Sequence, residues 1–566
     1  MHTKKISKAL KMIAATVVIF VVALCITIAA TRANSNNEKW RKITRKPHII
    51  VMIADDMGWN DVSFHGSNQI PTPNIDALAY NGVILKNHYV LPVCTPSRTA
   101  FFTGRYPIRD GMYGYPLKAG EDRSIPLNVT LMPEHLHRLG YATHMVGKWH
   151  VGYSDDNKTP VRRGFQTFYG YYNGYITYFN HTITQDNQTG FDMHRDNQNE
   201  LKPDMSNKNK YATDIFTDEA VKIIDKHDDD QPLYLQISHL APHSSDGLET
   251  LETRDLAEVN ETFAYIQEIH RRKYAGMVSA LDESVGRVVA ALSKNNLLKN
   301  SIILFMSDNG AQTFGLLENY GSNYPLRGLK FTLYEGGVHG VACVYSPLIK
   351  HKARVVNDLF HITDWLPTLY SAAGGNVNEL GVIDGINQWS NIKKEKIIGQ
   401  RKSLLVNINP EENLESAIIG QYKILKGSSA LYDGYFGDNV NDNDPSGPGY
   451  NVEDVIASPT SQSIADTTGN ATTYKEILQL REQSKIICKS FSKFSNCSVR
   501  CLFNLYNDPC ETTDISDKHP EMVEKLEYYI NEYRDVLVNQ KGGTVDINSY
   551  PRNFNGFWMP WLNSVK

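Results

Sequence analysis

Four short apolar runs between His48 and Ser307 each end in a cluster of polar residues, and this pattern constrains the fold more than any other feature of the sequence. Helical patterns separate the runs, which is typical of an α/β domain built on a largely parallel sheet. Ligands bind beyond the carboxyl ends of the strands in such sheets, so the four polar clusters can converge on one cleft. The runs are His48–Ala54, Ala142–Val146, Leu233–Ile237 and Ser301–Ser307.

The polar clusters at the ends of these runs contain carboxylates, amides, lysine and histidines. These residue types can hold a metal ion or an anion, although each cluster taken alone is more often a turn, a helix N-cap or a structural histidine. The clusters are Asp55-Asp56, Gly147-Lys148-Trp149-His150, His239 with His243, and Asp308-Asn309.

The chain of 566 residues is longer than one hydrophobic core usually supports, so we expect two packed units. The α/β pattern covers residues 46–400, and a smaller domain of antiparallel sheet plus helix is expected over residues 401–566. In this second part we predict strands at Leu404–Val406 and Ala417–Leu425, a long loop over Asp433–Gly469, and a helix from Pro520 to about Val538.

The N-terminal segment, residues 1–45, predicts entry into the secretory pathway. Lys4, Lys5, Lys8 and Lys11 precede an apolar run over residues 12–30 that is just long enough to span a bilayer. The lysines would stay cytoplasmic and direct the rest of the chain into the lumen. A cleaved signal peptide and a retained membrane anchor both fit this pattern.

Glycosylation sequons and cysteines agree with a lumenal location. One sequon is common by chance, but seven in a chain with a translocation signal carry more weight: Asn128, Asn157, Asn180, Asn187, Asn260, Asn470 and Asn496. Four of the seven cysteines cluster near the C-terminus and predict two disulfides with three possible connectivities: Cys488, Cys497, Cys501 and Cys510. A zinc site fits less well, because the paired C-x-x-C spacing and a histidine are missing. Cys343 is expected to be a buried free thiol.

The net charge of −4 gives no global basic field, so nucleic acid is not expected as a partner. An anionic substrate would have to be attracted by a local group of cations.

The most specific motif is Cys94-Thr95-Pro96-Ser97-Arg98, followed by Thr103-Gly104-Arg105. It resembles the signature of the sulfatase family, C-x-P-S-R followed by T-G, and differs mildly at Phe102. The resemblance implies that a formylglycine-generating enzyme oxidises Cys94 to formylglycine during secretion. One hydroxyl of the hydrated aldehyde would attack sulfur, and loss of the proton from the other, assisted by His150, would expel sulfate.

The same resemblance implies an alkaline-phosphatase-like fold with a mostly parallel sheet and a divalent ion at the strand ends. Oxygen ligands suit Ca²⁺, with Mg²⁺ as the alternative. The residues expected to hold the ion are Asp55, Asp56, Asp308, Asn309 and the modified side chain of Cys94.

Further residues match motifs that contact the sulfate in this family. Lys148 and His150 lie in a G-K-W-H string, Lys330 follows Pro325–Leu329, and His243 has the family spacing, whereas His239 is expected to be an interior histidine. Fixed cations stabilise the negative charge that develops on a transferring sulfuryl group. The expected catalytic residues are Cys94, Arg98, Lys148, His150, His243 and Lys330, of which Lys148, His243 and Lys330 also bind substrate.

Within the family, the strings Arg162–Phe165, Lys273–Met277 and Leu333–Gly337 resemble the arylsulfatase B branch. This branch implies a sulfated glycosaminoglycan substrate, such as N-acetylgalactosamine 4-sulfate, or an aryl sulfate, in a lysosomal or extracellular location. The chain differs from the branch in its few cysteines before residue 400 and in the segment 433–469. Two other functions are considered: a phosphoesterase of the same fold, and an inactive matrix-binding protein.

Overall fold

The structure is a computed structural model, and it describes residues 45–394, 401–427, 432–437, 447–488 and 494–562, with Ile6, Met12, Ala23, Leu24 and Thr27 as single residues before them. Within these residues, no helix is long and apolar enough to cross a membrane. The predicted signal or anchor segment, 12–30, lies almost wholly outside the described residues, so that expectation stays a prediction. Residues 47–566 form one compact unit, and the description below concerns this unit.

A nine-stranded sheet forms the centre of the unit, and its five middle strands, β10, β1, β9, β4 and β5, are parallel. Antiparallel pairing of β11 with β10 and of β8 with β5 makes the sheet mixed toward its edges. The strands in spatial order are β12 (Arg354–Val356), β2 (Val83–Leu85), β11 (Ala342–Tyr345), β10 (Ser301–Ser307), β1 (His48–Ala54), β9 (Leu233–Ser238), β4 (Ala142–Lys148), β5 (Thr167–Tyr171) and β8 (His194–Asn197).

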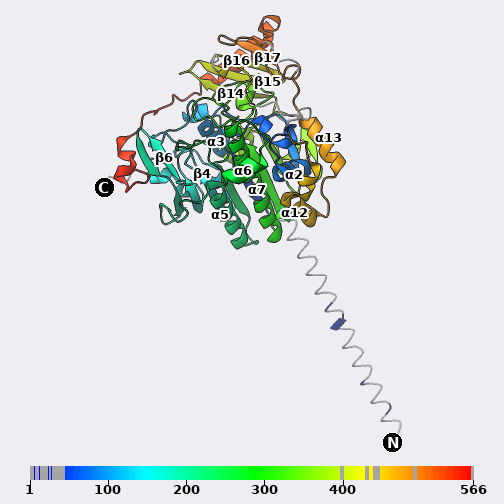
Figure 1. Cartoon of the computed structure of the whole chain (residues 1–566). Helices are drawn as coiled ribbons and strands as arrows, with labels where there is room; N and C mark the ends of the chain where they lie inside the picture. The colour runs from blue at the N-terminus through cyan, green and yellow to red at the C-terminus, as the bar shows by residue number, and fades with distance from the viewer. Residues whose placement is uncertain are drawn as a thin grey trace. The chain divides into compact units, whose positions relative to one another are not determined.

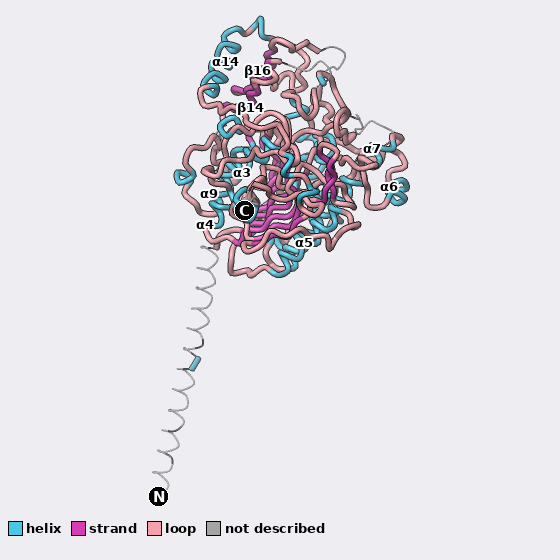
Figure 2. Tube along the Cα trace, turned by 90° about the vertical axis from the view of Figure 1, so that its left-hand side faces the viewer, coloured by secondary structure: helices cyan, strands magenta, loops and turns pink. Residues whose placement is uncertain are grey.

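Side chains of β1 alternate between two hydrophobic cores, as a strand buried on both faces requires. Ile50 and Met52 belong to one core, and Ile49 and Val51 to the other. Helices on the two sides of the strands cover these cores (Figure 2). The first core contains residues of α2 (Pro73–Asn81), α5 (Ala212–Lys226), α6 (Leu256–Thr262) and α7 (Ile269–Lys294), and the second contains residues of α3 (Cys94–Thr103), α4 (Met132–Arg138), α9 (Trp365–Ala372) and α10 (Trp389–Ile392).

A smaller antiparallel sheet follows the large one in sequence and lies beyond one end of it (Figure 1). One of its faces packs on Leu333, Tyr334 and Val338, and the other packs on α14 (Pro520–Arg534) through Leu526 and Ile530. The predicted antiparallel sheet with a helix is therefore confirmed. Its strands, in spatial order, are β14 (Ser403–Asn409), β15 (Leu414–Ile419), β16 (Tyr422–Lys426) and β17 (Cys501–Asn504).

The long loop predicted over 433–469 is wrong for its second half, which contains α11 (Val452–Ala457) and α12 (Pro459–Thr468). Ser458 caps α12 at its N-terminus, and Ile464 is buried in the core that also contains α2 and α7. The polar composition of this segment favoured a loop, whereas packing on the large domain stabilises the two helices. α13 (Tyr474–Ser484) packs on the same core, so part of 401–566 belongs structurally with the large sheet, and the boundary near residue 400 stays a proposal.

Two smaller boundaries also differ from the predictions. The run Ala417–Leu425 is interrupted at Gly420, whose φ of 60° forms the turn between β15 and β16. Glycine adopts this left-handed conformation without steric cost. The last predicted helix ends at Arg534 instead of near Val538.

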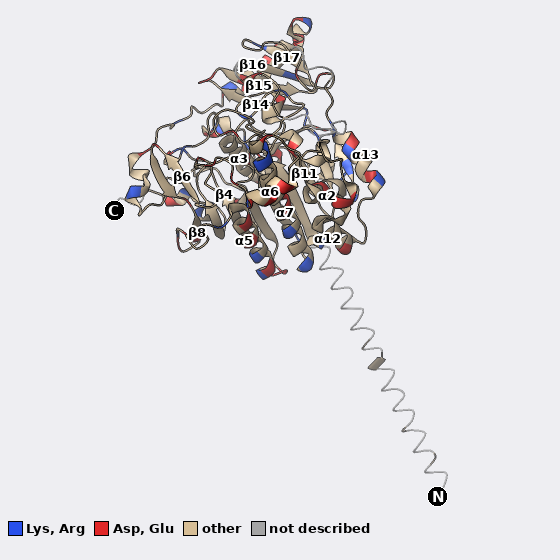
Figure 3. Ribbon diagram, in the orientation of Figure 1, with Lys and Arg blue, Asp and Glu red and all other residues tan. Residues whose placement is uncertain are grey.

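Disulfides join Cys488 to Cys510 and Cys497 to Cys501, which selects one of the three possible connectivities. Cys94 and Cys343 are free and buried, as predicted for Cys343. Of the seven sequon asparagines, Asn260 is half-buried and the other six are exposed. Charged residues of both signs are mixed over the outer helices, in agreement with the small net charge (Figure 3).

We expect the thiols of Cys94 and Cys343 to resist alkylation in the folded, unconverted protein. Both are buried, and burial raises the pKa of each thiol, so little reactive thiolate forms. Peptide mass spectrometry of protein made without the converting enzyme should find both alkylated only after denaturation, and the other four cysteines of the described segments only after reduction. Rapid alkylation of native Cys94 would contradict the buried position.

Asp76, in the first turn of α2, is fully buried and accepts hydrogen bonds from the Phe64 N–H at 3.1 Å, the Thr72 hydroxyl at 2.9 Å and the Tyr450 hydroxyl at 3.1 Å. Burial, reinforced by the charge of Asp282, raises the pKa of this carboxyl from 3.8 to about 7. The folded protein therefore binds a proton at Asp76 that the unfolded chain releases near pH 4.

The contribution of Asp76 to stability should consequently fall as the pH rises from about 4 to about 7, and change little above that. Asp76→Asn mimics the protonated form, since its amide can donate to Tyr450. Between about pH 4 and pH 7, the unfolding free energy of this variant should therefore fall less steeply than that of the parent protein, by up to roughly 1.4 kcal/mol per pH unit. Urea unfolding of both proteins at pH 5 and pH 7.5 isolates the effect from other titrating groups. An equal loss of unfolding free energy in the two proteins would exclude it.

Candidate active site

The registers of the central strands bring the four polar clusters level with one another. Ala54 pairs with Ser307 across β1 and β10, and Ser238 pairs with Gly147 across β9 and β4. The residues that follow these positions therefore leave the sheet at the same edge. Asp55 and Asp56 follow β1, Asp308 and Asn309 follow β10, Lys148 ends β4, and His243 lies in the loop after β9.

Cys94 is the first residue of α3, and the motif residues around it define both ends of this helix. The Ser97 hydroxyl donates to the Leu91 carbonyl at 3.2 Å and accepts from the Leu91 N–H at 2.9 Å, which fixes the loop before the helix. Gly104 ends the helix with a φ of 65°, and its N–H donates to the Ala100 carbonyl. This left-handed C-cap explains the glycine of the Thr-Gly pair.

Three buried carboxylates and three buried cations neutralise one another at the strand ends. Lys148 Nζ lies 2.6 Å from Asp55 Oδ2, and Lys330 Nζ lies 2.6 Å from Asp56 Oδ2. Arg98 donates to Asp308 Oδ2 from Nε at 3.1 Å and from Nη2 at 2.8 Å. A buried charge is tolerated only when it is paired in this way.

These pairs control the ionisation of the carboxylates. Burial would raise the pKa of Asp55, but the charges of Lys148 and Arg98 bring it below the ordinary value. Burial would also raise the pKa of Asp56, but the charge of Lys330 and the hydrogen bond from its ammonium group lower it below the ordinary value. The pKa of Asp308 is raised, by burial and by the charge of Asp55.

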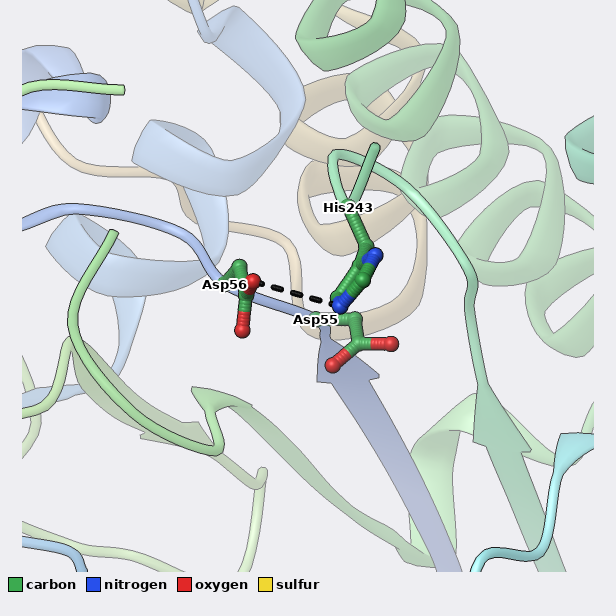
Figure 4. A group of neighbouring side chains, drawn as sticks. All are labelled: Asp55, Asp56 and His243. Carbon is green, nitrogen blue, oxygen red and sulfur yellow. Dashed lines mark ion pairs between the residues drawn. The ribbon is translucent and has the colours of Figure 1, made fainter. Parts of the chain in front are cut away.

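His243 lies beside both aspartates, and Figure 4 shows its ring pointing toward them. Its Nδ1 is 2.5 Å from the Ser244 carbonyl, so this nitrogen carries the proton and donates. Its Nε2 then accepts from Lys330 Nζ at 3.2 Å and lies 3.4 Å from Asp56 Oδ2. Tyr175 stacks on the ring, with 5.5 Å between ring centroids.

His150 follows β4 with a φ of 56°, a left-handed conformation that turns the chain after Lys148. Its Nε2 donates to the Leu117 carbonyl at 2.9 Å, and its buried Nδ1 has no hydrogen-bond partner. Burial, together with the charge of Lys148, lowers the pKa of the ring well below its ordinary value. The structure therefore holds a neutral imidazole with a free acceptor nitrogen.

Oxygen atoms suitable for a hard cation remain unsatisfied at this edge of the sheet. Asp55 Oδ1 and Asn309 Oδ1 are buried without a hydrogen-bond partner. Asn309 Nδ2 donates to Asp56 Oδ1 at 2.7 Å, and the Asp56 N–H donates to Asp308 Oδ1 at 3.3 Å, so the four side chains share one space. Carboxylate and amide oxygens are the ligands that Ca²⁺ and Mg²⁺ prefer, and this donor set fits such an ion.

The atoms of Asp55, Asp56 and His243 lie within 4.8 Å of one another, which is close enough for all three to bind one ion. His243 was expected to be a catalytic and substrate-binding residue, and it was not among the expected metal ligands. Because both of its ring nitrogens already have partners, we consider the oxygen atoms the better ligands.

All the residues expected in the site meet at this edge of the sheet. Cys94 is fully buried, and the charges of Lys148, Lys330, Asp55 and Asp308 all act on its thiol. His239 is an interior histidine that contacts the Ser284 hydroxyl at 3.0 Å, as expected.

Two residues of the site were missed from sequence. Asn319 Nδ2 donates to the Asp56 carbonyl at 2.8 Å, and Tyr175 stacks on His243. Tyr175 lies in the loop after β5 and Asn319 in the loop after β10, but neither belongs to a recognisable motif, so the sequence carried no specific signal for them.

Comparisons with known proteins agree with this geometry. A family model described as sulfatase matches residues 47–375. Arylsulfatase J from Mus musculus is 34% identical over 538 residues, which cover 92% of this chain and 81% of that protein. N-acetylgalactosamine-6-sulfatase from Homo sapiens is 27% identical over 391 residues, which cover 67% of this chain and 71% of that protein.

Solved structures share the fold. Ps i-CgsB in complex with k-i-k-neocarrahexaose is 25% identical, with a TM-score of 0.66 over 88% of this chain and 94% of that chain. The PsFucS1 sulfatase from Pseudoalteromonas sp. is 21% identical, with a TM-score of 0.64 over 90% of this chain and 95% of that chain. These relatives do not single out the arylsulfatase B branch. The match over most of the α/β region, together with the site geometry, shows that the chain belongs to the sulfatase family and has its alkaline-phosphatase-like fold.

Proposed function

We propose that this protein hydrolyses sulfate esters with a formylglycine made from Cys94 and with a bound divalent cation, Ca²⁺ in preference to Mg²⁺. The observation that carries the proposal is the position of Cys94 at the N-terminus of α3, where the charges of Lys148 and Lys330 act on the same buried side chain. A structural cysteine has no need of such surroundings. Membership of the sulfatase family supports the same chemistry.

Formylglycine would supply, as its hydrate, one hydroxyl to attack sulfur and a second whose deprotonation releases the product. Arg98, Lys148 and Lys330 hold positive charge against the sulfate oxygens, where charge accumulates in the transition state. They are preorganised for this task, because each is already fixed by a buried carboxylate.

His150 is assigned as the base at position 94. Its free Nδ1 can accept a proton, while the hydrogen bond from Nε2 to Leu117 fixes the tautomer and the ring orientation. Lys330 Nζ donates a hydrogen bond to His243 Nε2 at 3.2 Å. We assign this pair as the source of the proton for the leaving oxygen.

Asp55, Asp56, Asp308 and Asn309 would hold the cation through their oxygens, two of which, Asp55 Oδ1 and Asn309 Oδ1, lack a hydrogen-bond partner. The ion would supply positive charge for orienting the sulfate and for stabilising the nucleophile.

The substrate class follows from the relatives and from the sequence. N-acetylgalactosamine-6-sulfatase acts on a sulfated amino sugar, as its name says, and this supports a sulfated carbohydrate substrate here. The finer assignment, the 4-sulfate of N-acetylgalactosamine, rests on the resemblance to the arylsulfatase B branch. The N-terminal apolar run, the exposed sequons and the disulfides support a secretory, lysosomal or extracellular location.

The first test is peptide mass spectrometry across residues 94–98 of protein secreted by eukaryotic cells, together with sulfate release from an aryl sulfate and from chondroitin 4-sulfate. We expect an aldehyde at position 94 and release of sulfate. Cys94→Ala should fold and lose turnover, since no other side chain can form the hydrated aldehyde. Cys343→Ala, which removes the other buried thiol, should keep it. An unmodified Cys94 in an active protein would refute the mechanism.

The second test is thermal unfolding with and without Ca²⁺. A cation that binds the folded state alone stabilises it by about 2.7 kcal/mol at a hundred times its Kd. Asp55→Asn should lose this stabilisation, because it removes a buried carboxylate oxygen without changing its shape. Asp517→Asn, at an exposed aspartate, should retain it. The cation site is excluded if neither Ca²⁺ nor Mg²⁺ raises the unfolding temperature of the parent protein.

A further inference from the structure

A cavity of about 340 Å³ adjoins the sulfate-binding lysine, and its volume lies within the range of small-molecule sites. Phe331 lines it and directly follows Lys330, whose Nζ lies 5.6 Å from the centroid of the Phe331 ring. A group joined to a sulfate held at Lys330 can therefore extend into this cavity. None of the expected catalytic residues lines it.

Aromatic rings form much of the wall. Tyr115 lies opposite Phe331, with 6.0 Å between ring centroids, and Tyr334 and Tyr432 also line the space. Tyr115 is 55% exposed, although it is large and partly apolar. Such rings offer flat apolar faces that suit the faces of a sugar or aryl ring.

Phe331 has a φ of 74°, a left-handed conformation that is rare for a bulky residue. The Phe331 N–H donates to the Pro92 carbonyl at 2.8 Å, two residues before Cys94, and this bond holds the conformation. Strained backbone of this kind persists where the surrounding structure requires it, commonly at binding sites.

The electrostatics of the cavity differ from those of the sulfate site. Among the described residues that line it, Glu412 is the only charged one. Glu412 lies at the tip of the β14–β15 hairpin, where Asn409 Nδ2 donates to its Oε2 at 3.0 Å. A hydrogen bond to Glu412 raises the pKa of the Tyr115 phenol to about 12, so the phenol stays neutral and donates.

We propose that this cavity binds the leaving-group ring of the substrate, an uncharged sugar or aryl ring, and that Glu412 disfavours a ring that carries a second anionic group. The inference rests on the proposed sulfatase function and adds the specificity determinant. Phe331 and Tyr115 contact the faces of the ring, and Glu412 accepts hydrogen bonds from its hydroxyls. A carboxylate or second sulfate on the ring would meet Glu412, and none of the described residues of the cavity wall is a cation that could offset the repulsion.

Two aryl sulfates that differ by one charge test this directly: 4-methylumbelliferyl sulfate, which is neutral apart from its sulfate, and the 7-sulfate of 7-hydroxycoumarin-4-acetic acid, which adds a carboxylate. The measured quantity is the ratio of their kcat/KM values. We expect the parent protein to favour the neutral substrate by roughly threefold, the size of one solvent-screened charge interaction, and the preference to shrink at high salt.

Glu412→Gln should abolish this preference, and Glu412→Lys should invert it. Glu411→Gln is the matched control, since Glu411 is exposed, adjacent and outside the cavity wall, and it should leave the ratio unchanged. Tyr115→Ala should raise KM for both substrates by a similar factor, with a smaller effect on kcat.

The outcomes separate the subsite from the chemistry. If all variants hydrolyse the neutral substrate and the ratio of kcat/KM values for the two substrates is the same in each variant, the role of Glu412 is overturned. The sulfatase function would remain intact. Failure of the parent protein, with formylglycine present, to hydrolyse either substrate would overturn the proposed function and this inference with it.

Discussion

Mutual neutralisation of six buried charges at one edge of the sheet is the constraint on which the rest of this structure depends. The charges belong to Asp55, Asp56, Asp308, Arg98, Lys148 and Lys330, each of which is 3% exposed or less. Separating any pair would leave an uncompensated charge in the interior, at a cost of several kcal/mol. Because the partners come from β1, β4, β10, α3 and the Lys330 loop, their pairing requires these elements to keep one relative arrangement. The same arrangement presents three fixed cations and unsatisfied oxygens to a ligand.

Much of this site could be predicted because its parts are local in sequence. An apolar run predicts a buried strand, the residues after it lie at the carboxyl edge, and parallel strands share that edge. The exact partners could not be predicted in this way. Lys330 reaches Asp56 across 274 residues from a loop without secondary structure, and the left-handed φ of 62° at Asp56 depends on the surrounding chain. Asn319 and Tyr175 depend on tertiary position alone, and were missed for that reason.

The errors in the fold have a related cause. The segment 433–469 is rich in Gly, Asn, Asp and Ser, so its composition favoured a loop, yet α11 and α12 form where a few apolar residues reach the core. Val452, Val455 and Ile464 are buried there, and Asn451 and Ser458 supply the N-caps. Caps placed before widely spaced apolar residues were the available signal. This signal is weak because the helices are short, and short helices are stabilised by packing more than by intrinsic propensity.

The two sites that we propose, one for the sulfate and one for the leaving group, are built from different parts of the chain. The cations that we propose to face the sulfate belong to the α/β region and are tied to the strand ends by buried pairs, so they can vary little without loss of the fold. Glu412 and Leu414, in contrast, reach the neighbouring cavity from a hairpin of the small sheet, and Glu412 is exposed. A hairpin tip can change its residues at little cost to the core. Reaction type can therefore stay constant across relatives while the leaving group changes, and the residues that choose the substrate should be sought at this hairpin and the aromatic wall beside it.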